Sequence, residues 1–266
     1  MRAGVKPYLA LLSARLRTLL QYRAAAFAGF TTQLFWGGIR MMVFYAFYEN
    51  APADVSLNYT QIVAYIWLGQ AFLGLFPYRV DHEIAELVRS GNVAYELLRP
   101  VDLYALWFAR TAAERIAPTA MRATPMIVVA ALVGWLPWPG WGRLAAFAAL
   151  MIGAVLVSSA FTMLMNISMF WTLSGVGINV VMSSLVFLLS GMLCPLPLFP
   201  DWALPVLEAL PFRAMADVPF RLFAGDVPLA AVPRMAVFIL AWVATMILIG
   251  RWLMARATGR LVVQGG

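Results

Sequence analysis

The chain has 266 residues, of which 63% are hydrophobic and 12% are charged. Soluble domains carry about 25% charged residues, so this composition excludes an ordinary soluble protein and indicates a membrane protein with several spans. The formal charge of +7 does not indicate a nucleic-acid-binding surface, because the basic residues are spread over the ends of apolar segments rather than gathered in one cluster.

The first predicted element is an amphipathic helix over residues 5–22. Arg15 and Arg17 lie away from its apolar side, which carries five leucines: Leu9, Leu12, Leu16, Leu19 and Leu20. A helix of this kind lies in the headgroup layer of a membrane. We therefore expect an interfacial helix here, and the alternative is a helical lead-in to the first span.

Six apolar segments are predicted to be transmembrane helices, because crossing about 30 Å of hydrocarbon takes about 20 apolar residues. They cover residues 24–48, 60–78, 104–136, 144–170, 175–194 and 231–253. The third is too long for a simple crossing, and it contains Pro118 and Pro125, which can kink it. The expected fold class is an all-α membrane protein with a single transmembrane domain over residues 1–266.

The connector between the second and third predicted spans is densely charged. Asp81 is suited to cap a helix, with Glu83 in its first turn and Arg89 in its last, where each charge complements the helix dipole. Gly91 lies at the expected stop. Apolar residues recur at the i, i+3 and i+4 positions Ile84, Leu87 and Val88. We predict a short amphipathic helix over residues 81–91.

A proline-rich segment precedes the last predicted span. Residues 195–212 are too broken by proline to cross a membrane and too apolar for an ordinary loop. The prolines are Pro195, Pro197, Pro200, Pro205 and Pro211. We expect short re-entrant helices here, between the fifth and sixth spans, that dip into the outer leaflet.

The basic residues also predict which side of the membrane each segment occupies. With six spans, both termini and the 81–91 connector share one side, which carries fourteen basic residues, including Arg2 and Arg260. Arg40 falls inside the first span, and the opposite side carries four: Arg143, Arg213, Arg221 and Arg234. The positive-inside rule therefore places both termini and the connector in the cytoplasm.

Motifs for catalysis or cofactor binding are absent from the sequence. Lys6 is the only lysine, so no P-loop is possible, and neither GxSxG nor HExxH occurs. His82 and Cys194 are the only histidine and cysteine, which excludes a two-histidine metal site and an intrachain disulfide. We expect no catalytic, cofactor-binding or metal-binding residues. The matched broken helices that indicate a secondary transporter are also missing.

Two stretches resemble a known family. EIAELVRSGNVAYELLRPVDLYALWFAR, residues 83–110, resembles the signature stretch of a bacterial branch of the type-2 ABC exporter permeases, the branch that includes toxic-compound and viologen-type exporters. GMLCPLPLFPDWALPVLEALPF, residues 191–212, resembles the outer re-entrant segment of that branch. The order of six spans, interfacial helix and connector helix extends the resemblance over nearly the whole chain.

The resemblance implies a permease subunit of an ATP-driven exporter in the bacterial cytoplasmic (inner) membrane. It also implies a second permease, identical or related, and two cytoplasmic P-loop ATPase subunits. Those subunits would bind ATP-Mg and hydrolyse it, so this chain itself would be no enzyme and would bind no cofactor. The substrate and the choice between homodimer and heterodimer stay open. The alternative function is a stand-alone secondary carrier or channel.

In such a permease the connector helix is a coupling helix that seats in a cleft of the ATPase. The residues expected to act in ATPase coupling are Asp81, Glu83, Ile84, Glu86, Leu87, Val88 and Arg89. The apolar stripe would bury against permease or ATPase, and the charged residues would form rim salt bridges worth about 0–1 kcal/mol each. The alternative is a solvated connector whose charges serve solubility.

Polar residues inside the predicted spans are candidates for the translocation pathway or for the interface between permeases. They are Arg40, Asn166, Asn179 and Ser183. Arg40 has three interpretations: a partner for a polar group on a neighbouring helix, a snorkelling residue near the outer headgroups, or part of the pathway lining. The asparagine and serine side chains are more often packing contacts between helices than ligands.

Overall fold

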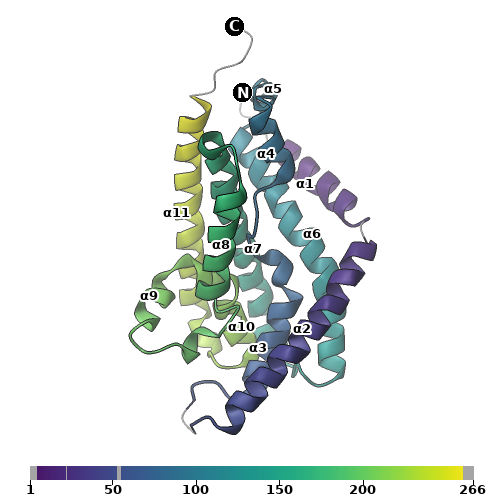
Figure 1. Ribbon diagram of the computed structural model, residues 1–266, viewed down its shortest axis with the longest axis vertical. Coiled ribbons are helices and arrows are strands. Elements are labelled where there is room, and N and C mark those ends of the chain that lie inside the picture. Colours follow the sequence, from purple (N-terminus) through teal and green to yellow (C-terminus); the bar gives the residue numbers. More distant parts are fainter. Residues whose placement is uncertain (1–4, 22, 53–54, 260–266) are drawn as a thin grey trace.

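A computed structural model describes residues 5–21, 23–52 and 55–259 of the protein. The described residues form an all-helical bundle without strands, which confirms the expected fold class at that level (Figure 1). The eleven α-helices of the described part are α1 Lys6–Leu19, α2 Arg23–Glu49, α3 Tyr59–Ala71, α4 His82–Arg89, α5 Val93–Leu97, α6 Leu103–Leu132, α7 Trp141–Thr172, α8 Val176–Leu189, α9 Leu204–Ala209, α10 Asp217–Ala224 and α11 Val232–Thr258.

Helix α3 lies at the centre of the bundle. Every residue from Ile62 to Ala71 is buried, and α2, α6 and α10 pack around it. The helix starts at a capping box, in which the Asn58 side chain accepts from the Gln61 amide and the Gln61 side chain accepts from the Asn58 amide. Trp67 stacks on Trp135 at a centroid distance of 4.3 Å. Since this part of α3 has no exposed polar face, its position depends on packing on all sides rather than on amphipathicity.

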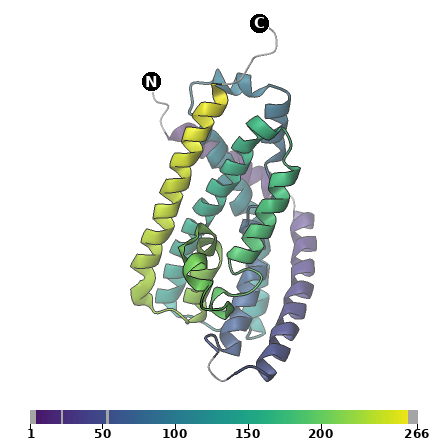
Figure 2. The same cartoon turned by 60° about the vertical axis from the view of Figure 1, so that its left-hand side comes forward.

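Two helices are long and apolar enough to cross a membrane among the described residues. They are Trp141–Thr172, which is α7, and Leu229–Thr258, which is α11 with the 3-10 turn before it. The two pack side by side along the bundle (Figure 2). Helix α7 is mostly buried, whereas α11 exposes large apolar side chains such as Leu240 and Leu248. The exposed face of α11 is thus suited to lipid.

Two of the predicted spans coincide with shorter helices. Helix α3 has 13 residues and α8 has 14, which corresponds to about 20 Å each at 1.5 Å per residue. A 3-10 turn, Leu73–Leu75, extends α3 toward the connector. Both helices are shorter than the hydrocarbon core of about 30 Å, so six complete membrane crossings remain a prediction.

The proline-rich segment after α8 folds into short turns and helices. It comprises 3-10 turns at Leu196–Leu198 and Pro211–Met215, with α9 between them. Helix α10 follows, which the sequence interpretation left unassigned. In contrast, α6 runs continuously through Pro118 and Pro125. Three positions used in the sequence analysis, residue 22, Arg2 and Arg260, lie outside the described residues.

Candidate functional site

The apolar side of α4 faces the bundle. Ile84 is fully buried, Val88 is 7% exposed, and Leu87 is partly buried. They pack with Trp107 of α6 and Met163 of α7 in one apolar cluster. The sequence left open whether this apolar stripe packs against the permease or against the ATPase. In the structure it packs against the permease.

Asp81 joins α4 to the rest of the bundle through charge. Its carboxylate caps α4 by accepting from the amides of Glu83 and Ile84. The same carboxylate binds Arg110 of α6 in two places, at 2.6 Å from Nε to Oδ2 and at 3.0 Å from Nη2 to Oδ1. Such a paired fork combines charge with a fixed geometry.

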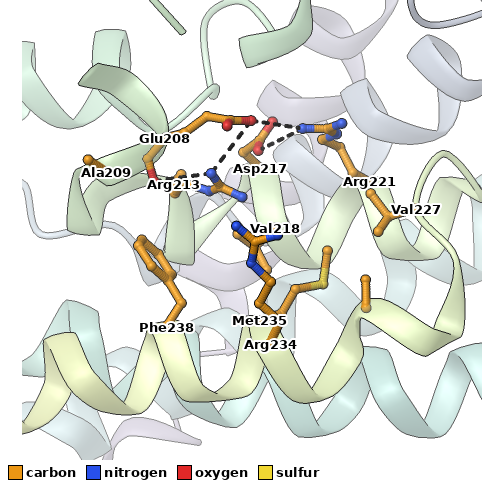
Figure 3. Close-up of a pocket in the computed structure, with 11 residues that line it drawn as sticks. Glu208, Ala209, Arg213, Asp217, Val218, Arg221, Val227, Arg234, Met235 and Phe238 are labelled. Atoms are coloured by element: carbon orange, nitrogen blue, oxygen red, sulfur yellow. Dashed lines mark hydrogen bonds and ion pairs between the residues drawn. The ribbon is translucent and has the colours of Figure 1, made fainter. Parts of the chain in front are cut away.

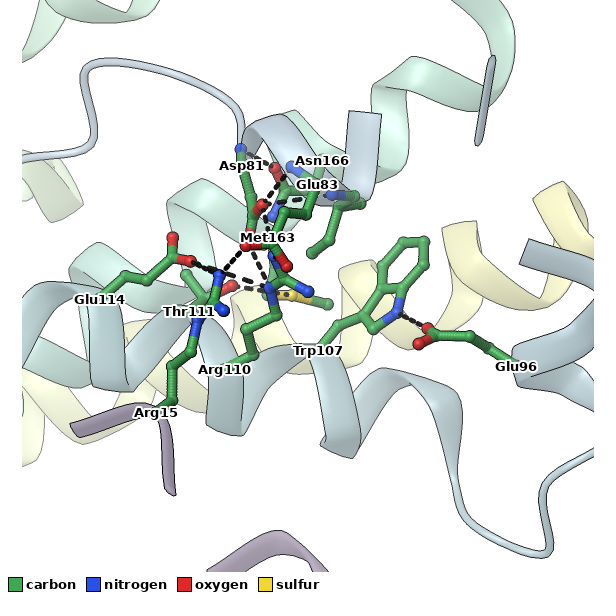
Figure 4. A network of polar contacts seen from close by, with 11 residues as sticks. Arg15, Asp81, Glu83, Glu96, Trp107, Arg110, Thr111, Glu114, Met163 and Asn166 are labelled. Carbon is green, nitrogen blue, oxygen red and sulfur yellow. Dashed lines mark hydrogen bonds and ion pairs between the residues drawn. The ribbon is translucent and has the colours of Figure 1, made fainter. Parts of the chain in front are cut away.

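A wider ion-pair network surrounds this contact (Figure 4). Arg110 also lies 2.6 Å from Glu83, and Glu83 pairs with Arg15 of α1. Arg15 reaches Glu114 of α6 at 3.3 Å. Three acidic and two basic side chains thus connect α1, α4 and α6, although these residues are far apart in the sequence.

Two asparagines hold the backbone that leads into α4. The amide of Asp81 donates to Asn166 Oδ1 of α7 at 2.8 Å, and the amide of Val80 donates to Asn179 Oδ1 of α8 at 2.9 Å. At the other end of α4, Arg89 Nε donates to the carbonyl of Leu173 at 3.1 Å. The connector is therefore tied to α7, α8 and the turn between them.

Comparison with known proteins identifies the family. Residues 34–265 match the family model of the ABC-2 family transporter proteins. The chain belongs to this family. No curated protein and no solved structure matches it. As an ABC-2 permease it is a membrane protein of the ABC transporters, a class that associates with ATPase subunits.

The tip of this ABC-2 permease, beside α4, exposes apolar side chains. Tyr95 of α5 is 70% exposed, and Leu98, the next residue after α5, is 81% exposed. Glu96 links α5 to α6, because its carboxylate accepts a hydrogen bond from Trp107 Nε1 at 2.5 Å. His82, Glu86 and Arg89 form the exposed polar side of α4. The free surface at this end is therefore polar on α4 and apolar on α5.

The network lowers the pKa of Glu83. Burial alone would raise it, but the hydrogen bond from Arg15 and the charges of Arg110 and Arg15 outweigh burial. The pKa of Arg15 is raised for the reciprocal reason, because Glu83 and Glu114 offset its own burial. Both groups are therefore charged at neutral pH.

The four polar residues predicted within the spans do not form one site. Asn166 and Asn179 hold the connector, as described above. Arg40 of α2 donates to the carbonyls of Met192 and Leu193 at 2.7 and 2.9 Å. This contact fits the first of its three interpretations, a partner for polar groups of a neighbouring segment. Ser183 donates to the carbonyl of Val180 in its own helix.

Three members of the network were not singled out from the sequence as site residues. They are Arg15 in α1 and Arg110 and Glu114 in α6. Both helices were predicted without assigning partners to these charges. The i, i+4 spacing of Arg110 and Glu114, which lie 3.8 Å apart, was the one local signal. The contacts to α1 and α4 depend on helix packing, which no local pattern encodes.

Proposed function

We propose that the chain is the permease subunit of an ATP-driven exporter. It crosses the bacterial inner membrane six times, with both termini and α4 in the cytoplasm, and it forms the pathway with a second permease. Separate P-loop ATPase subunits bind ATP-Mg and hydrolyse it. The family match supports the permease assignment. The observation that carries the coupling mechanism is a connector helix bonded to several long helices at once.

The surface that meets the ATPase is the exposed side of α4 together with the α5 tip. Ile84 and Val88 are buried within the permease, so they fix the position of α4 and do not contact the ATPase. Tyr95 and Leu98 are the exposed apolar anchors. Interfaces gain most of their affinity from a few such anchors, whereas rim ion pairs add little. Glu86 and Arg89 would therefore set orientation.

Movement of the ATPase would reach the membrane through the bonds already described. A displacement of α4 acts on α1 and α6 through Arg15 and Arg110, and on α7 and α8 through Asn166 and Asn179. Charged and backbone bonds in a partly buried site resist shear better than apolar contacts alone, because their geometry is directional. The connector thus works as a rigid joint.

The second permease is expected to contact α2 and α8. Helix α2 stands at the side of the bundle (Figure 2). It exposes Phe35 and Trp36, and α8 exposes Val180 and Val181. A cysteine at Val181, in a Cys194→Ser background, should cross-link two copies if the partner is identical. A cysteine at Leu240 on α11 is the control that should not cross-link.

The test of the whole proposal is co-purification and transport with single substitutions at the tip. Leu98→Glu should release the ATPase and abolish ATP-dependent transport while the permease stays folded. Leu132→Glu is the matched control, because Leu132 is 82% exposed at the opposite end of the bundle. Transport by the purified chain alone, without ATP or an ATPase, would indicate a secondary carrier or channel and would overturn the proposal.

A further inference from the structure

A polar cavity lies beside α9 and α10 (Figure 3), which Figure 1 shows in the half of the bundle away from α4. Its volume is about 440 Å³, within the range of small-molecule sites, and α9, α10 and the first turns of α11 enclose it. Three arginines and two acidic residues line it: Arg213, Arg221, Arg234, Glu208 and Asp217. The lining therefore carries a net charge of about +1 when all five are ionised.

Two of the arginines are engaged by acidic neighbours. Arg221 donates from Nε to Asp226 at 2.6 Å and lies 3.5 Å from Asp217. Arg213 lies 3.6 Å from the Glu208 carboxylate and donates to its backbone carbonyl at 3.1 Å. Glu208 itself is about half exposed, so it can turn away toward solvent. These contacts hold the arginines in place around the cavity.

Arg234 differs from the other two. It lies in the first turn of α11, and its guanidinium points into the cavity toward Arg213 (Figure 3). Within the part of the chain that the structure describes, no acidic side chain pairs with it. The start of α11 is the positive end of the helix dipole, which adds positive potential beside it. Arg234 is exposed, so a ligand that approaches along the surface of α11 can reach its guanidinium without breaking an ion pair.

One buried donor at the cavity lacks an acceptor among the described residues. The Nε of Arg213 is buried without a hydrogen bond, whereas the buried carboxylate of Asp217 has Arg221 at 3.5 Å as its counter-charge. Buried polar atoms in folded proteins are nearly always hydrogen-bonded, so the free N–H of Arg213 calls for an acceptor from a ligand or water. An oxygen of an anion is such an acceptor, and Arg234 lies beside the same space.

The cavity also has an apolar wall that continues onto the bundle surface. Phe238 and Met235 of α11 line it, and the Arg213 guanidinium lies 5.2 Å from the centre of the Phe238 ring. On the same helix Val237 is 67% exposed and Leu240 is 57% exposed. Because α11 is apolar enough to cross a membrane, its first turn lies at headgroup level and these side chains face acyl chains.

We propose that this cavity binds the phosphate of a membrane phospholipid from the outer leaflet. Arg234 is the principal phosphate ligand, Arg213 the second, and the acyl chains lie along α11 past Val237. A single phosphodiester charge balances the lining charge. The outer-leaflet position rests on the orientation in the proposed function, but lipid binding by the purified permease needs no ATPase and is tested separately.

The test is lipid binding to the purified permease in detergent, followed by native mass spectrometry and thermal unfolding. Phosphatidylglycerol should bind to the wild type and raise its unfolding temperature. Arg234→Gln should weaken this binding about tenfold, the effect of losing one charged hydrogen bond. Because Arg234 has no ion pair to lose, the variant should fold normally. Arg256→Gln, which removes the same charge from the other end of α11, should bind as the wild type does.

Four results would overturn the proposal. Unchanged binding by Arg234→Gln would exclude Arg234 as the ligand, and an equal loss in Arg256→Gln would reduce the effect to total charge. Diacylglycerol, which lacks phosphate, should not compete; if it does, the site is only apolar. Inorganic phosphate should compete weakly; competition as strong as that of phosphatidylglycerol would assign the cavity to the free anion instead of a lipid.

Discussion

The guanidinium of Arg110 and the carboxylate of Asp81 form a paired contact that is almost closed to solvent. The Arg110 side chain is 13% exposed and that of Asp81 is 2% exposed. Asp81 thus has two roles at once, as the cap of α4 and as its charge link to α6. A displacement of α4 cannot keep both sets of bonds unless α6 follows it.

Removing the Asp81 carboxylate should separate these two roles. Asp81→Asn keeps an N-cap but loses the ion pair, whereas Asp81→Ala loses both. Because Arg110 keeps Glu83 and Glu114 as partners, losing the Asp81 charge costs about 1–3 kcal/mol, and the cap about 1 kcal/mol more. Thermal unfolding in detergent should rank the wild type above Asp81→Asn and that above Asp81→Ala. Glu86→Ala is the control, since its 3.7 Å pair with Arg89 is exposed. Equal unfolding temperatures for Asp81→Ala and Glu86→Ala would contradict the assignment.

The features of α4 that the sequence could predict are local ones. Capping by Asp81, the charges of Glu83 and Arg89, and the spacing of Ile84 and Val88 all depend on neighbours within one or two turns. The same reasoning could not decide which surface buries the stripe. That outcome depends on α6 and α7, which contribute Trp107 and Met163.

The ion-pair network shows why the contacts between helices could not be predicted from the sequence. Glu83 meets Arg15 across 68 residues and Asp81 meets Arg110 across 29. A charged residue near a span end has the same sequence appearance whether it faces solvent or a partner helix. Helix α10 is different, because Asp217 in its first turn and Gly225 after its last residue were available as start and stop signals.

Loosening the backbone ahead of α4 should be measurable without any transport assay. Asn179→Ala removes the acceptor for the Val80 amide and leaves that amide without its bond, which costs about 1–3 kcal/mol. Hydrogen–deuterium exchange over residues 80–90 should therefore become faster. Ser183→Ala, one turn further along α8, loses only a bond within its own helix and should leave this exchange unchanged. Equal exchange in the two variants would remove Asn179 from the connector's support.

The lowered pKa of Glu83 predicts a specific acid dependence. A carboxyl whose folded pKa is depressed stabilises the fold above its unfolded pKa of about 4.3, and this contribution is lost as pH falls through the folded value. Glu83→Gln should therefore unfold at a lower temperature than the wild type at pH 7, and the difference should shrink below about pH 4. Glu86→Gln, on the exposed side of α4, should show little difference at either pH. A gap for Glu83→Gln that stays constant with pH would exclude the ion pairs with Arg15 and Arg110 as its source.

The contact of Arg40 with the segment after α8 can be followed with the chain's only cysteine. Arg40→Met removes the donor to the Met192 and Leu193 carbonyls, directly beside the partly buried Cys194. Without this bond the segment should open more often, so a membrane-permeant maleimide should label Cys194 several-fold faster. Arg234→Met removes an arginine from the same end of the bundle without touching Cys194, and its labelling rate should match the wild type. Unchanged labelling in Arg40→Met would show that other contacts hold the segment and would favour the two other interpretations of Arg40, snorkelling and pathway lining.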